Sequence, residues 1–72
     1  MITKGDTYTS HYDSAITPGR TCTITITVTH TGRQTIIYEL IQHWSDREPS
    51  RTTNQVSRKT FQERINGLEK QS

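Results

Sequence analysis

The chain is 72 residues long, has a formal net charge of +2 and contains one cysteine. A chain of this length supports one domain with a small core, so we expect a single domain over residues 1–72. One cysteine excludes an internal disulfide and a multi-cysteine zinc site, and favours a reducing compartment. No apolar run reaches the roughly 18 residues of a membrane span, and the first residues lack the apolar region of a signal peptide. We therefore expect a cytoplasmic protein with no membrane partner.

Two strands are predicted in the first half of the chain. Residues 6–12 alternate in polarity and predict the first. Residues 21–30 predict the second, because every odd position from 21 to 29 is threonine while the even positions 22 to 28 are apolar. A period of two is typical of a half-buried strand, here with a hydroxyl face toward solvent.

Residues 35–44 predict a third strand, which is apolar on both faces. Such a strand is either covered on both sides or bends so that its faces exchange roles. A three-residue loop over 30–32, with Gly32 in the left-handed conformation, would join it to the second strand. That loop would place Ile26 opposite Ile36 and keep the apolar faces together.

The C-terminal part predicts a loop, a helix and a tail. Residues 45–55 are polar, and Pro49 excludes a central strand there, although residues 52–56 can add a short edge strand. A helix is expected over 57–67, with Ser57 as its N-cap and a hydrophobic staple between Val56 and Phe61. Gly67 would end it, and residues 69–72 would form a tail.

This order predicts a mainly β protein with one C-terminal α-helix, arranged β-β-β-(β)-α. Two architectures fit: a small bent antiparallel sheet that closes into an SH3-like barrel, and an open three-stranded sheet with the helix across one face.

The chain resembles small SH3-like proteins of bacteriophages and prophages. The resemblance rests on the opening Gly5-Asp6-x-Tyr8, the threonine-rich hairpin, and the closing strand and helix over 56–65. It implies a phage origin, and hence the cytosol of a host cell, but no activity and no site residue. The open alternative resembles the arm-type DNA-binding domains of tyrosine recombinases, without their dense arginine and lysine content.

Catalytic and metal-binding patterns are weak in this sequence. The three histidines lie on three different segments, without the spacing of metal ligands. Cys22 belongs to the apolar face of its strand, which favours a core residue over a nucleophile. We therefore predict no enzyme activity, no metal site and no cofactor.

The C-terminal third holds the excess of positive charge, and it predicts contact with DNA or RNA. Arg58 and Lys59 fall in the first turn of the predicted helix, where the helix dipole disfavours cations. A phosphate backbone or an acidic partner would explain them. The predicted nucleic-acid-binding residues are Arg47, Arg51, Arg58, Lys59 and Arg64.

A second set of residues predicts a protein-binding surface. Tyr8 and Trp44 could stack on a base or a peptide, and Thr25 and Thr27 belong to a flat, neutral face. A long strand with an unpaired edge also favours a homodimer, through that edge or through the threonine face.

Our primary interpretation is a small non-enzymatic binding module that contacts nucleic acid through its basic third. The alternative is a phage accessory protein that binds and modulates a host protein through its sheet surface.

Overall fold

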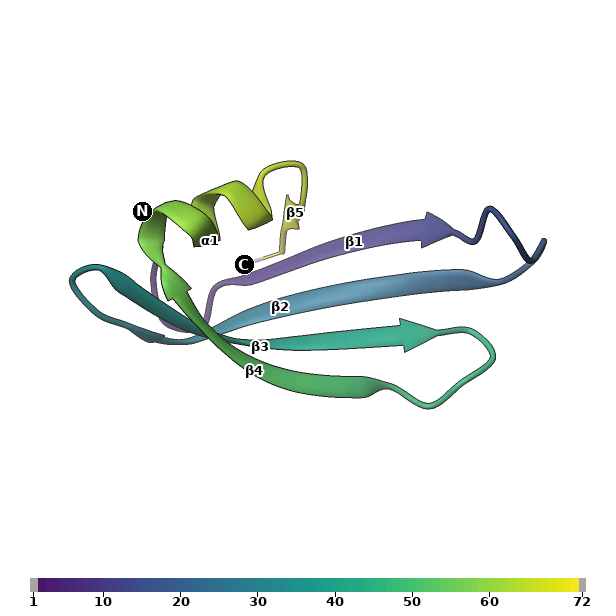
Figure 1. Cartoon of the computed structure of the whole chain (residues 1–72), viewed down its shortest axis with the longest axis horizontal. Coiled ribbons are helices and arrows are strands. Elements are labelled where there is room, and N and C mark those ends of the chain that lie inside the picture. The colour runs from purple at the N-terminus through teal and green to yellow at the C-terminus, as the bar shows by residue number, and fades with distance from the viewer. Residues whose placement is uncertain (1, 72) are drawn as a thin grey trace.

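Five antiparallel strands form one open sheet in the computed structural model, which describes residues 2–71. The sheet has the order β4-β3-β2-β1-β5, and one helix lies over one of its faces (Figure 1). The elements in chain order are β1 (Thr7–Asp13), β2 (Thr21–Thr31), β3 (Thr35–Trp44), β4 (Ser50–Ser57), α1 (Arg58–Ile65) and β5 (Glu69–Lys70).

The mainly β fold with a C-terminal helix is confirmed, and the sheet does not close. Strands β4 and β5 form its two edges and do not pair with each other, so the barrel alternative is not formed. The structure is closer to the predicted open three-stranded sheet with the helix across one face, and it has two additional strands at the edges.

The alternation in β2 puts its apolar side chains on the face that α1 covers. Ile26 lies opposite Tyr8 of β1 and Leu40 of β3, and Val28 lies opposite Tyr38. The predicted sharing of apolar faces is therefore right, but the predicted pairing of Ile26 with Ile36 is wrong.

The β2–β3 connection explains that error. The register shifts between Val28 and His30, at a bulge around Thr29, and the strands continue to Thr31 and Thr35. The loop is thus 32–34 instead of 30–32, and Gly32 does not adopt a positive φ. A bulge inserts one residue into one strand, which a count of loop residues does not reveal.

Two polar segments are more ordered than the sequence predicts. The loop expected over 45–55 ends at Pro49, because β4 starts at Ser50 and pairs along its whole length with β3. In the expected tail 69–72, Glu69 and Lys70 pair with Thr9 and Tyr8 as β5. Ser72 lies outside the described residues.

The helix begins and ends close to the predicted positions. Ser57 is the N-cap, and its hydroxyl accepts a hydrogen bond of 3.1 Å from the Thr60 backbone N–H. Gly67 follows the C-cap Asn66 with φ of 92°, a left-handed conformation that favours glycine. This turn directs the chain back to pair with β1.

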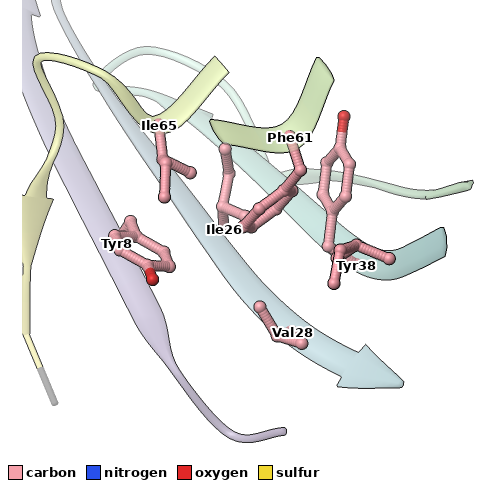
Figure 2. Packing of buried hydrophobic residues seen from close by; sticks show 7 residues of the cluster. Tyr8, Ile26, Val28, Tyr38, Phe61 and Ile65 are labelled. Carbon is pink, nitrogen blue, oxygen red and sulfur yellow. The ribbon is translucent and has the colours of Figure 1, made fainter. Parts of the chain in front are cut away.

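The hydrophobic core lies at one end of an elongated molecule with dimensions of 42 × 21 × 20 Å. Phe61 of α1 is fully buried between the rings of Tyr8 and Tyr38, at centroid distances of 6.0 and 5.2 Å (Figure 2). Ile65, one turn later, packs on the same cluster. We call this part the helix end; it comprises α1, β5, residues 2–6 and the β2–β3 loop. The opposite end, with the β1–β2 and β3–β4 loops, is the distal end (Figure 1).

Candidate functional site

The structure separates the five cations predicted to bind nucleic acid. Arg47 lies in the β3–β4 loop at the distal end. Arg51 of β4 points to the face opposite α1, where its Nε is 3.5 Å from a carboxylate oxygen of Glu39. Lys59 and Arg64 are exposed on α1 at the other end of the molecule. These residues therefore do not form one continuous surface.

Arg58 has a structural role that the sequence did not reveal. Its Nε–H donates hydrogen bonds to the carbonyl oxygens of Gly32 and Arg33, at 2.9 and 3.0 Å. Its backbone N–H donates to the Gln34 carbonyl at 2.9 Å. The arginine thus ties the start of α1 to the β2–β3 loop, which explains a cation in the first turn of a helix without invoking a ligand.

The hydrogen bonds from Arg58 to the β2–β3 loop place Arg33 at the helix end. Arg33 is exposed in the β2–β3 loop, and its carbonyl accepts one of the Arg58 hydrogen bonds. Sequence reasoning missed Arg33 because it precedes the basic third by more than ten residues. Only the antiparallel return of the chain places it beside α1.

Charge is distributed unevenly along the long axis. The distal end is acidic by one charge, and the central Arg51–Glu39 pair is neutral. The helix end is basic by three charges. Its charged residues are Lys4, Arg33, Arg58, Lys59, Arg64 and Lys70 against Asp6, Glu63 and Glu69.

Two of the six cations at the helix end, Arg58 and Lys70, already have partners within the fold. Arg58 is engaged by the loop carbonyls, and the Lys70 ammonium is 3.5 Å from the Asp6 carboxylate. Lys70 is exposed as well as paired, and the other exposed cations at this end are Lys4, Arg33, Lys59 and Arg64. These four residues, which we call the helix-end cations, are the candidate site.

Trp44, predicted to stack on a base or a peptide, lies at the distal end, where its ring contacts Arg20 and Tyr12. The Arg20 guanidinium carbon lies 4.1 Å from the centroid of the Trp44 ring, and Tyr12 contacts the ring edge-on with centroids 5.8 Å apart. The Nε–H of Arg20 donates a hydrogen bond to a carboxylate oxygen of Asp46, with a distance of 2.9 Å between the two heavy atoms. Tyr12, Arg20 and Trp44 cover Cys22, which is 1 % exposed. A hydrogen bond with the Cys22 thiol, together with partial burial, raises the pKa of Tyr12. Trp44 thus stabilises the end of the sheet.

Tyr8, predicted to lie on a partner surface, is a core residue. Its side chain faces Phe61, and the residue is 6 % exposed. Burial raises the pKa of its hydroxyl. The alternation of residues 6–12 already indicated which side of the strand Tyr8 occupies, but only the position of α1 shows that this side is covered.

The predicted threonine face is present and open. Thr25 and Thr27 lie opposite Thr9 and Thr7 of β1, on the side of the sheet away from α1. Half-buried Ile41 of β3 lies opposite Thr25 on the same face. Among residues 2–71, no element packs on this side of the sheet (Figure 1).

The histidines remain on separate parts of the fold. The Nδ1 atom of His11 is 3.0 Å from the Thr23 hydroxyl oxygen, and His30 and His43 are exposed. Within residues 2–71, no three side chains are grouped as metal ligands and no pocket is formed. No described helix is long and apolar enough to cross a membrane.

Comparison of the chain with known protein families, with curated proteins and with solved structures finds no match. The resemblance to small phage proteins therefore stays a prediction.

Proposed function

We propose that the protein is a small binding module that contacts the phosphate backbone of a nucleic acid with its helix-end cations. The observation that carries this proposal is the separation of charge along the molecule. Three net positive charges gather at one end of an elongated fold whose other end is slightly acidic.

The arrangement of the helix-end cations suits a phosphate backbone better than a compact anion. Lys59 and Arg64 lie on α1, and Arg33 lies on the neighbouring loop. Their side chains are exposed, and residues 2–71 form no pocket that would enclose a small ligand. Exposed cations of this kind fit the repeating charges of a nucleic acid, which are bound largely through release of counterions.

Charge reversal at the two ends of the molecule tests this proposal. Binding of labelled single- and double-stranded DNA and RNA is measured by fluorescence anisotropy at increasing salt. Lys59→Glu combined with Arg64→Glu should weaken binding at least tenfold and lower the salt slope by about two, roughly one per lost phosphate contact.

The matched control is Arg47→Glu combined with Arg51→Glu, which changes the net charge by the same amount away from the helix end. It should leave the affinity within about threefold, because screening limits interactions between exposed charges to roughly a Debye length. Equal losses in both double variants would contradict the proposal. So would absence of wild-type binding at low salt, where electrostatic binding is strongest.

A second candidate function is binding of a host protein through the open threonine face. The observation that favours it is the uncovered side of the sheet, where half-buried Ile37 and Ile41 lie on the same face as Thr25 and Thr27. Thr25→Asp and Thr27→Asp should then abolish capture of a specific protein by the folded chain, after nuclease treatment. Unchanged capture by both variants would reject this surface.

A further inference from the structure

We propose that two copies of this chain pair through strand β4 to form a closed antiparallel dimer with one continuous sheet. The proposal rests on the difference between the two edges of the sheet, and on the charges that flank β4.

The β1 edge of the sheet is partly covered within one chain. Strand β5 pairs with Tyr8 and Thr9, and the backbone N–H of Gln71 donates to the Thr7 carbonyl at 2.8 Å. The side chain of Lys70 also crosses to Asp6. A new strand cannot add along this part of the edge without displacing β5.

The β4 edge lacks the devices that usually prevent strand addition. Proteins protect edges with prolines, lysines, bulges or very short strands. Strand β4 is eight residues long, and Arg51 is its single charged residue. Its register with β3 is continuous from Ser50 to Ser57, without a bulge, and Pro49 lies outside the strand. The outer edge of β4 is therefore a suitable template for another strand.

The charges beside β4 identify a second copy as the occupant. Glu48 lies two residues before the strand and Lys59 two residues after it, and both are exposed. Antiparallel pairing about the middle of β4 brings the loop that carries Glu48 of each copy close to the first turn of α1, with Lys59, of the other. With Asn54 on the symmetry axis, Arg51 faces an uncharged Ser57, so that no like charges oppose each other.

This pairing forms a closed assembly. A two-fold axis uses both β4 edges, while β5 obstructs continuation from the β1 edge. Side chains opposite each other in an antiparallel pair share one face, so both α1 helices lie on the same side of the joined sheet. The acidic distal end of each copy then lies beside the basic helix end of the other, so Arg47→Glu with Arg51→Glu is a valid control for nucleic-acid binding at chain concentrations where the protein is monomeric.

Sedimentation equilibrium without nucleic acid tests the dimer independently of the proposed function. The wild type should show a reversible equilibrium between the 8.3 kDa chain and twice that mass. Glu48→Lys and Lys59→Glu should each weaken dimerisation roughly tenfold, because each reversal affects two symmetric ion pairs. The double variant should restore it, since it exchanges the charges and keeps them complementary.

A second pair of variants tests the edge itself. Thr53→Lys places a cation in the middle of β4, and Thr25→Lys places the same cation on β2, two strands away from the edge. The first should abolish the dimer and the second should retain it, with circular dichroism confirming that both are folded. Equal behaviour of these two variants would overturn the proposal. A monomeric wild type at all concentrations would also overturn it, and would point to an extended segment of another protein as the occupant of β4.

Discussion

Arg58 and Lys59 are neighbours in the first turn of α1, yet the fold uses them differently. The guanidinium of Arg58 is directed toward the loop carbonyls of Gly32 and Arg33, whereas Lys59 is exposed. An acidic substitution of both residues is therefore a poor test of nucleic-acid binding, because it removes a structural tie together with a candidate phosphate contact.

Arg58→Lys should lower the free energy of unfolding by about 1 kcal/mol, since lysine keeps the charge but lacks the Nε–H that donates to two carbonyls. Lys59→Ala should change it by less than about 0.5 kcal/mol, as expected for an exposed side chain. Urea denaturation of the two variants measures both values. If Arg58→Lys leaves the free energy of unfolding unchanged, the two hydrogen bonds from the Arg58 Nε–H do not contribute to stability.

The interactions of the Asp6 carboxylate should make the stability of the protein depend on pH. A hydrogen bond from the Thr3 backbone N–H, together with the Thr3 hydroxyl and the Lys70 ammonium, lowers the pKa of Asp6 below its usual 3.8, although burial opposes this effect. Because the folded-state pKa is the lower one, the stabilisation is fully present at pH values well above 3.8, the usual pKa that Asp6 has in the unfolded chain. It is lost as the pH falls through the folded-state pKa.

Urea denaturation at pH 7 and at pH 3 should show this loss in the wild type. Asp6→Asn should be less stable at pH 7 and less sensitive to acid. Asp13→Asn serves as the control, because Asp13 is exposed at the end of β1; it should retain the acid sensitivity of the wild type. An Asp6→Asn variant with the wild-type pH profile would contradict the assignment.

At the scale of elements, α1 supplies the second layer that the sheet needs. A single sheet must bury one face against another element, and Phe61 and Ile65 are the two fully or nearly fully buried side chains of the helix. Ser57 caps the helix and Val56 packs against the core. The short connection between β4 and α1 thus sets where the core forms.

Phe61→Ala should destabilise the protein by about 3–5 kcal/mol, because it removes a buried ring between two tyrosines. That loss is a large part of the stability of a domain this small. Gln62→Ala, at the next and exposed position, should be nearly neutral. Thermal unfolding followed by circular dichroism compares them. Similar melting temperatures for the two variants would show that α1 does not hold the core together.

At the scale of the whole molecule, the two ends of the sheet differ in their layers. The helix end has two layers, and among residues 2–71 seven buried residues form its core. At the distal end the sheet is a single layer, which Trp44, Arg20 and Tyr12 cover in part. Local stability follows the number of buried apolar contacts, so the ends should open with different free energies.

Hydrogen exchange measured by NMR should resolve this difference within one strand. The amides of Ile26 and Val28, under α1, should exchange more slowly than those of Thr23 and Ile24 toward the distal end. All four lie in the central strand β2, so edge effects do not distinguish them. Uniform exchange along β2 would indicate that the whole sheet opens as one cooperative unit.

Strands β1 to β3 and the helix were predictable because their signals are local. The period of two in 21–30 follows from alternation within one strand, and the cap at Ser57 involves residues three apart. Strand β5 and the start of β4 were missed since Glu69, Lys70 and Ser50–Arg51 carry no apolar alternation. Their pairing depends on neighbours distant in the chain.

The candidate site was predicted only in part for the same reason. Lys59 and Arg64 followed from their position in the basic third, and they remain in the site. Arg47 and Arg51 were included because they are close in sequence, but the β3–β4 loop carries Arg47 to the opposite end, and strand alternation turns Arg51 to the opposite face. Arg33 required knowledge of which elements are neighbours.

The sequence by itself determined the first three strands, the apolar face of β2 and the presence of a helix with a defined cap. These properties depend on interactions between residues a few positions apart. The tertiary structure alone decided that the sheet stays open and that Tyr8 is buried. It also decided that Arg58 donates hydrogen bonds to the β2–β3 loop and that the predicted cations are separated between the two ends of the molecule. Each of these depends on which elements become neighbours, and the bulge at Thr29, the positive φ of Gly67 and the packing of Phe61 set that arrangement.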